Sequence, residues 1–255
     1  MLQLSGVSAG YQGKDVLFDI SASFEPGVNY CLLGPNGCGK TTLLRAIARL
    51  IDYRGSISWN GTDLKKMSRR EIAGHIAVMC QNSGSSFSYS VYDAVMLGRY
   101  ARMKRTLFSG PGEKDREAVR NCLERTNLWE LRKRPIDQLS GGQRQRVFLA
   151  QALAQDPDVI LLDEPANHLD MRHQIDLVDS LHAWTADGAH SVIGVFHDID
   201  LALRLSENML FLKDGKLLAQ GPFAQAANRQ FLQNVFEMDV VGYMQASRRK
   251  WDEVS

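Results

Sequence analysis

The sequence predicts an α/β fold in which a mainly parallel sheet is covered by helices on both faces. Short aliphatic runs alternate with amphipathic segments in the first and last thirds of the chain, as is typical of parallel sheets. A glycine-rich segment, GPNGCGKT, joins one of these runs to a helix-like stretch. Between residues 83 and 154 the pattern becomes helical, which indicates an insertion into the sheet fold and not a domain that follows it.

The composition is that of an ordinary globular chain. Of the 255 residues, 44% are hydrophobic and 23% are charged, so the chain can bury a sizeable core. The formal net charge of +1 argues against a general nucleic-acid-binding surface, and we expect no nucleic-acid partner. No apolar run approaches the ~18–20 residues that span a bilayer, and the first residues lack the pattern of a signal peptide. The four cysteines form no C-x-x-C pair, so we expect reduced thiols in a soluble intracellular protein.

The first eighty residues contain strand-like pieces on both sides of the glycine-rich segment. Glycine and proline turns separate them, and we expect strands over residues 2–7, 16–24, 28–33, 55–61 and 76–80. Directly after the glycine-rich segment, apolar side chains recur at helical spacing. They predict a helix over residues 42–51 with Leu43, Leu44, Ile47, Leu50 and Ile51 on its apolar side.

The rest of the chain predicts helices first and then a return to alternation. We expect helices over residues 91–100, 113–126, 143–154 and 171–184, and strands over residues 159–162, 191–196 and 209–213. The whole chain, residues 1–255, is therefore interpreted as one domain with a helical insertion at about residues 83–154. A tail at about residues 221–255 carries no recognisable motif.

The glycine-rich segment has the chemistry of a phosphate cradle. It fits the pattern G-x-x-x-x-G-K-[ST] between a strand and a helix, which is the context that this motif requires. Its glycines allow backbone N–H groups to approach phosphate oxygens, and the helix N-terminus favours negative charge. Lys40 can reach the β- and γ-phosphates and Thr41 can ligate Mg²⁺. The predicted contacts to the nucleotide phosphates are Gly34, Pro35, Asn36, Gly37, Cys38, Gly39, Lys40, Thr41 and Thr42.

A second acidic site follows the aliphatic strand at residues 159–162. Asp163 and Glu164 come directly after this run, where a carboxylate beside the phosphate cradle can hold Mg²⁺. The adjacent Glu164 is placed to polarise an attacking water. The two sites together predict a nucleotide-hydrolysing enzyme.

The run Leu139-Ser140-Gly141-Gly142-Gln143 closely resembles the signature sequence of ATP-binding-cassette (ABC) ATPases. Together with the phosphate cradle and LLDEP, the resemblance covers about residues 2 to 220. It implies a P-loop NTPase (RecA-like) core with an N-terminal antiparallel β subdomain and an inserted α-helical subdomain. It also implies that two cassettes form a head-to-tail homodimer. Each signature, Ser140, Gly141, Gly142 and Gln143, would then close in trans on the ATP held by its partner's P-loop.

The resemblance assigns roles to several other positions. Tyr11 resembles the aromatic residue that stacks on adenine, and Gln81 resembles the glutamine that contacts Mg²⁺ and the attacking water. His197 resembles the histidine that contacts the γ-phosphate. Glu164, His197 and Gln81 are therefore the expected catalytic residues, and Thr41, Gln81 and Asp163 the expected magnesium ligands.

The segment after LLDEP resembles the D-loop, which crosses the dimer interface. Its expected interface residues are Asn167 and Asp170. The chain departs from many relatives at Ala166, where a threonine or serine is common, so a hydroxyl is missing beside the interface. This difference removes no ligand of the nucleotide.

Within the family, the details resemble ATPases of importers for iron-siderophore, haem and vitamin B12 substrates. The matching stretches are GPNGCGKTTLL, SVYDAVMLGRY, LSGGQRQRVFLAQALAQ and LLDEP with the following NHLD. The resemblance implies a separate multi-spanning permease in two copies, a periplasmic or extracellular substrate-binding protein, and a place on the cytoplasmic face of the cell membrane. We expect residues 83–100 to form the groove that receives a cytoplasmic helix of the permease.

Other functions stay open at this point. One alternative is the ATPase of a zinc, manganese or molybdate importer. Another is an ABC ATPase that acts on nucleic-acid machinery, although such proteins usually carry tandem cassettes or further modules. A regulator without turnover would be expected to lack Glu164 or His197, and both are present. The basic run at residues 99–105 is either a solvated face or a surface near lipid or the permease.

Overall fold

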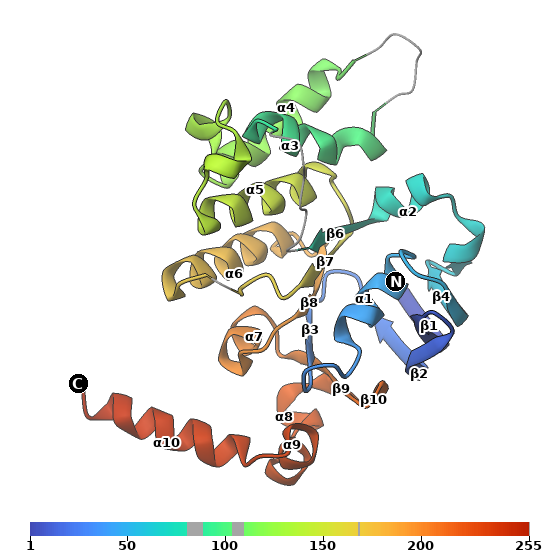
Figure 1. The fold of residues 1–255 in the computed structure, drawn as a ribbon, viewed down its shortest axis with the longest axis vertical. Helices are drawn as coiled ribbons and strands as arrows, with labels where there is room; N and C mark the ends of the chain where they lie inside the picture. The colour runs from blue at the N-terminus through green and yellow to red at the C-terminus, as the bar shows by residue number, and fades with distance from the viewer. Residues whose placement is uncertain (81–88, 104–109, 168, 255) are drawn as a thin grey trace.

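Two sheets form the framework of the molecule (Figure 1). The computed structural model describes residues 1–80, 89–103, 110–167 and 169–254. A four-stranded antiparallel sheet has the order β2 (Lys14–Phe24), β1 (Leu2–Tyr11), β4 (Tyr53–Trp59) and β5 (Thr62–Asp63). A six-stranded sheet has the order β10 (Lys216–Pro222), β9 (Asn208–Lys213), β3 (Tyr30–Leu33), β8 (Ser191–Val195), β7 (Val159–Asp163) and β6 (Ile76–Cys80). The six-stranded sheet is parallel except at β10, which pairs antiparallel with β9.

The helices connect and cover these strands. Their bounds are α1 (Lys40–Ile47), α2 (Arg69–His75), α3 (Val91–Gly98), α4 (Glu113–Arg125), α5 (Gly141–Ala154), α6 (Met171–Thr185), α7 (Ile199–Leu205), α8 (Phe223–Ala226), α9 (Arg229–Phe236) and α10 (Val240–Asp252). Short 3₁₀ helices cover Leu64–Lys66, Arg99–Ala101, Trp129–Leu131 and Ile136–Gln138. The predicted P-loop core, antiparallel β subdomain and helical insertion are all present.

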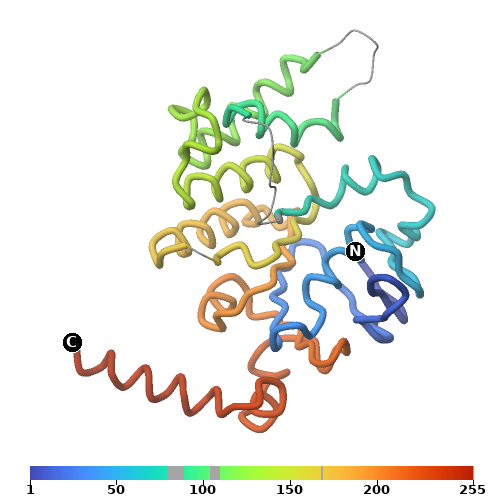
Figure 2. Tube along the Cα trace, in the orientation of Figure 1, coloured from blue at the N-terminus to red at the C-terminus, as the bar shows by residue number. Residues whose placement is uncertain are grey.

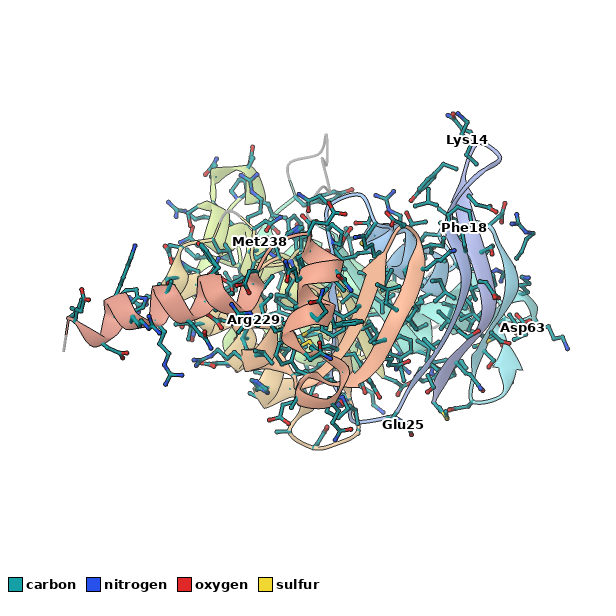
Figure 3. All side chains as sticks on the ribbon, turned by 90° about the horizontal axis from the view of Figure 1, so that it is seen from below. Lys14, Phe18, Glu25, Asp63, Arg229 and Met238 are labelled. Atoms are coloured by element: carbon teal, nitrogen blue, oxygen red, sulfur yellow. The ribbon has the colours of Figure 1, made fainter. Side chains whose placement is uncertain are left out.

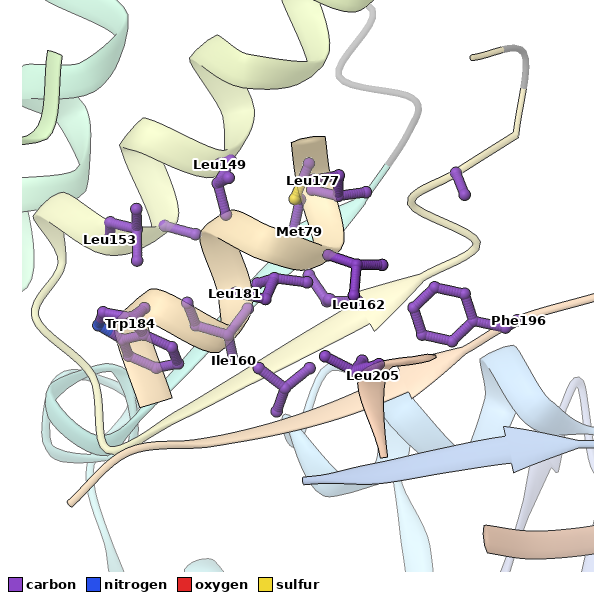
Figure 4. Packing of buried hydrophobic residues seen from close by; sticks show 14 of the residues in the cluster. Met79, Leu149, Leu153, Ile160, Leu162, Leu177, Leu181, Trp184, Phe196 and Leu205 are labelled. Carbon is purple, nitrogen blue, oxygen red and sulfur yellow. The ribbon is translucent and has the colours of Figure 1, made fainter. Parts of the chain in front are cut away.

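The parallel sheet is buried on both faces, and each face belongs to a different hydrophobic core. Along β7, Ile160 and Leu162 pack with α5, α6 and α7, as Figure 4 shows, whereas Val159 and Leu161 pack with α1 and the antiparallel sheet. Such a strand has no polar face, which explains why its sequence is a continuous aliphatic run. Helices alone do not cover the second face, because α1 shares it with β1, β2 and β4.

Strand register brings the ends that carry the site to one edge of the sheet. Asp163 pairs with Val195 on one side and Cys80 on the other, and Leu32 also pairs with Val195. The segments that leave β3, β7 and β8 therefore emerge side by side. In open α/β sheets, ligands bind at the carboxyl ends of the strands. The site is therefore expected where these three segments leave the sheet.

Helix α1 is shorter than predicted, because it ends at Ile47 and the expected helix continued to residue 51. Arg49 adopts a left-handed backbone with φ of 52°. The Leu50 N–H donates to Arg45 O at 2.8 Å and the Arg49 N–H donates to Ala46 O at 2.9 Å. These two bonds form a Schellman motif, which ends the helix and leaves Leu50 51% exposed.

The helical insertion shares the core of the sheet. Val91 from α3, Val119 from α4 and Val147 from α5 lie in the same hydrophobic cluster as Ile160 and Leu162 of β7. In Figure 1 these three helices stack above α6, which lies next to the sheet. The insertion is therefore anchored to the strand that carries Asp163.

Two arginines of the basic run are structural. Arg99 pairs with Asp115 at 3.1 Å and donates to Ala154 O at 2.8 Å. Arg102 donates to Gln155 O at 3.2 Å and also to Asp156 O. Both guanidinium groups satisfy carbonyls at the C-terminus of α5, where positive charge is favoured. These two residues thus hold the insertion together and do not form a free basic surface.

The C-terminal tail contains secondary structure. Leu232 and Val235 of α9 and Val240 at the start of α10 are buried in the core cluster. Beyond Met244, every residue of α10 is exposed, and the helix extends away from the body in Figure 2 and in the view from below in Figure 3.

Candidate active site

The loop between β3 and α1 wraps closely because of its glycines. Gly39 has φ of 105°, and a Cβ built there would lie 2.6 Å from Leu17 Cδ2. Gly34 has φ of 152°, and a Cβ there would lie 2.0 Å from Leu212 O. Both positions therefore require glycine. The predicted cradle is present as a compact loop whose backbone touches both sheets.

Lys40 begins α1 and lies over the loop. Its side chain is nearly buried, with only 5% of the residue exposed. The ammonium donates to Gly34 O at 2.7 Å and to Pro35 O at 2.9 Å. The same ammonium lies 3.9 Å from Cys38 Sγ, and burial raises the pKa of that thiol. The Gly34 and Pro35 carbonyls thus hold the Lys40 ammonium inside the cradle.

Thr41 and Asp163 link the two motifs that the sequence predicted separately. The Thr41 hydroxyl donates to Asp163 Oδ1 at 2.8 Å. Partial burial raises the pKa of Asp163, and the hydrogen bond from Thr41 opposes this shift. A hydroxyl and one carboxylate suit Mg²⁺, which keeps several waters and takes phosphate oxygens as further ligands. The described residues contain no group of three His, Cys, Asp or Glu side chains that could hold a metal without such help.

Glu164 lies beside this pair with both carboxylate oxygens engaged. His197 Nε2 lies 2.6 Å from Glu164 Oε1. The Asn167 amide donates to Glu164 Oε2 at 2.5 Å. His197 follows β8 and Glu164 follows β7, so the parallel pairing of these strands brings the two side chains together.

These residues line one cavity of about 520 Å³. Its walls combine the P-loop and α1 with the segments after β7 and β8. The lining residues are Val16, Asn36, Gly37, Gly39, Lys40, Thr41, Thr42, Glu164, Asn167 and His197. Val16 was not predicted to line the site, because an apolar residue at a strand start carries no signal of a ligand.

Tyr11 is not among the residues that line this cavity. It ends β1 and is 39% exposed, and its hydroxyl accepts a hydrogen bond from Arg45 Nη1 of α1 at 3.2 Å. Gln81 lies outside the described residues, as do residues 83–88 of the expected permease groove.

The signature forms a strongly capped helix N-terminus elsewhere on the chain. Ser140 Oγ accepts from the Gln143 N–H at 3.3 Å, and Gln143 Oε1 accepts from the Ser140 N–H at 3.1 Å. This reciprocal pair is a capping box. Ser140, Gly141, Gly142 and Gln143 are not among the residues that line the cavity of their own chain.

The two predicted D-loop residues lie in different surroundings. Asn167 lines the cavity, whereas Asp170 caps α6 by accepting from the His173 N–H at 2.9 Å. Ala166 is 8% exposed and belongs to the hydrophobic core. A methyl group therefore fits this buried position.

A strand, a glycine-rich loop, a helix and an acidic strand end, arranged around one cavity, define a P-loop NTPase. The comparisons with known proteins then specify the family. The profile described as "ABC transporter" matches residues 17–167, and the chain belongs to this family.

Individual relatives agree with this assignment. The chain is 34% identical to the iron(3+)-hydroxamate import ATP-binding protein FhuC of Bacillus subtilis, over 93% of this chain and 88% of the relative. It is 32% identical to the ferric enterobactin transport ATP-binding protein FepC of Escherichia coli, over 90% of this chain and 84% of the relative. The chain is therefore an ATP-binding ABC ATPase that couples ATP hydrolysis to transport.

Solved structures show the same fold. An inward-facing ABC transporter described as metal-chelate type aligns with a TM-score of 0.80 and 26% identity, over 93% of this chain and 89% of that one. The dimeric cassette MJ0796 bound to ADP and phosphate aligns with a TM-score of 0.75 and 25% identity, over 87% of this chain and 98% of that one. Within the described residues, no helix is both long and apolar enough to cross a membrane.

Proposed function

We propose that this chain is the single-domain ATPase subunit of an importer for iron-siderophore or related metal chelates, haem and cobalamin included. The relatives named for ferric hydroxamate and ferric enterobactin transport support this substrate class. Two copies would act with two copies of a separate permease at the cytoplasmic face of the membrane. A substrate-binding protein outside the membrane would deliver the chelate to that permease.

The observation that carries the hydrolytic role is the Glu164–His197 pair at 2.6 Å in the P-loop cavity. In this proposal Glu164 orients and deprotonates the attacking water, and His197 contacts the γ-phosphate. Lys40 and the loop N–H groups stabilise the charge that builds on the phosphoryl oxygens. Tyr11 would stack on adenine. Mg²⁺ would be held through Thr41 and Asp163 together with Gln81, and it would neutralise phosphate charge.

The dimeric arrangement is supported by the position of the signature. Residues 140–143 form a helix N-terminus that suits an anion, yet they do not line the cavity beside Lys40 in the same chain. A head-to-tail pair would bring this second set of donors to the partner's ATP. The D-loop residues Asn167 and Asp170 would then lie at the interface.

The test is to purify the chain with the membrane protein that it binds and reconstitute both in vesicles with the binding protein. We expect binding protein loaded with a ferric hydroxamate to stimulate ATP hydrolysis more than the empty protein does. Thr41→Ala in the ATPase subunit should abolish the stimulated rate, because it removes a magnesium ligand. Stimulation by zinc or molybdate instead of iron chelates would contradict the proposed substrate class.

A further inference from the structure

The signature helix contacts the start of the 164–170 segment, and it also contacts His173, which follows this segment in α6. At the first end, Gln145 Nε2 of α5 donates to Pro165 O at 2.5 Å. Beyond the other end, the His173 ring of α6 packs on Gly142 so closely that a Cβ built on Gly142 would lie 2.9 Å from His173 Cδ2. His173 is itself joined to Asp170, with Nδ1 2.8 Å from Asp170 Oδ1. One helix therefore contacts the start of this segment directly, and it reaches the end of the segment, Asp170, only through His173.

The first contact lies one peptide bond from Glu164. That residue has a left-handed backbone with φ of 53°, a conformation that costs an ordinary side chain free energy. Its carboxylate is held by Asn167, whose own N–H donates to Glu164 O at 3.2 Å. The position of Glu164 thus depends on the turn that begins at Pro165, because Asn167 of this turn holds both its carboxylate and its carbonyl.

Helix α6 donates hydrogen bonds to the later carbonyls of this turn, whereas α5 donates to the first one, that of Pro165. Gln174 Nε2 donates to Ala166 O at 3.3 Å and to Leu169 O at 3.2 Å. Pro165 is buried, so its carbonyl depends on a protein donor, and the Gln145 amide is that donor. Gln145 is itself partly buried and does not line the P-loop cavity.

We propose that Gln145 is a positioning residue that couples the signature helix to Glu164 of the same chain. This inference rests on the proposed function, in which the start of α5 binds the partner's ATP while Glu164 acts on its own. ATP bound by the partner would fix α5, and Gln145 would then hold Pro165 and Glu164 in the hydrolytic position. One site thereby senses whether the other is occupied, although Gln145 touches neither nucleotide.

The variant Gln145→Leu tests this coupling, since it keeps the approximate size of the side chain and removes the donor. In the full transporter we expect the maximal hydrolysis rate to fall about five-fold, the factor for the loss of one neutral hydrogen bond. The Hill coefficient for ATP should fall towards 1, and ATP binding by the isolated subunit should not change. Gln145→Glu, which turns an acceptor towards the Pro165 carbonyl, should be impaired at least as strongly.

Gln151→Leu is the matched control, because Gln151 lies on the same helix and its side chain makes no hydrogen bond to any described residue. It should keep both the rate and the Hill coefficient. An unchanged Hill coefficient in Gln145→Leu, or an equal loss in Gln151→Leu, would overturn the inference. Full hydrolysis by the native protein as a monomer would instead overturn the two-chain site itself. That result needs no variant, so it is distinguishable from a failure of the Gln145 inference.

Discussion

At the scale of single residues, Glu164 combines strain with two polar contacts. A left-handed backbone at a residue that is not glycine costs on the order of 1–3 kcal/mol and persists only where the surroundings impose it. Here His197 and Asn167 hold its two carboxylate oxygens. With this backbone, the Glu164 side chain lines the P-loop cavity.

Glu164→Gln should separate binding from turnover. The amide keeps the size of the carboxylate, so ATP binding and dimer formation should persist. It cannot accept a proton from water, so steady-state phosphate release should fall by about 10²–10⁴-fold. Nucleotide binding and phosphate release are measured on the same preparation, with the exposed Glu117→Gln as the control. Near-native turnover would show that another group activates the water.

The sequence predicted the charged residues of this site, but it did not predict the residues that pack against the site or its supporting segments. Lys40, Asp163 and Glu164 were predictable because each follows a local pattern next to a strand or helix. Val16 and Gln145 were not predictable, because their roles arise from the packing of β2 against the P-loop and of α5 against Pro165. Contacts between distant segments leave no mark in a local pattern.

At the scale of elements, the P-loop is packed against the antiparallel sheet at Gly39. A Cβ at this position would meet Leu17 of β2, whereas a Cβ at Gly37 would meet no atom within 4 Å. Both glycines have positive φ, 105° and 77°, so alanine costs backbone strain at either position. Only Gly39 adds a steric clash, at a cost of about 1–3 kcal/mol for an overpacked site.

We therefore expect Gly39→Ala to lower the melting temperature more than Gly37→Ala does. For a chain of this size, each kcal/mol corresponds to about 2–4 °C. Thermal unfolding without nucleotide measures the difference. Adding Leu17→Ala to Gly39→Ala should recover part of the loss if the clash causes it. Equal melting temperatures for the two single variants would show that the loop moves freely away from β2.

Element types were predictable where periodicity is strong, and element ends were less so. Burial of particular faces produces the aliphatic runs of β7 and β8 and the apolar spacing of α6. Each pattern lies within a short stretch of sequence, so it could be recognised there. The end of α1 was wrong because Arg49 takes a left-handed conformation that usually marks glycine. The sequence left two roles possible for the basic run at residues 99–105. The structure shows that Arg99 and Arg102 bind the end of α5.

At the scale of the whole molecule, the separation of the signature from the P-loop cavity predicts a shared site. Lys40→Ala should disable a site in cis, and Ser140→Arg should disable the partner's site in trans. In a heterodimer of these two variants, both defects then fall on one site and the other site is intact. Occlusion of ATP, measured on purified heterodimers, should give one nucleotide per dimer.

Occlusion is the better measurement here because turnover at two coupled sites can fail together. If the signature acted within its own chain, each site would carry one defect and no nucleotide would be occluded. The control is the wild-type dimer, which should occlude two. A value of zero from folded and associated heterodimers would contradict the head-to-tail arrangement.

The protruding part of α10 is governed by different physics from the rest of the chain. Past Met244 every residue of α10 is exposed, so helix–coil statistics contribute more to its helix content than tertiary packing does. Its last turns should fray and re-form in about a microsecond or less, far faster than any packed helix can open. The Arg248-Arg249-Lys250 charges therefore lie on an exposed, extended end of the chain, which increases the hydrodynamic radius of the molecule.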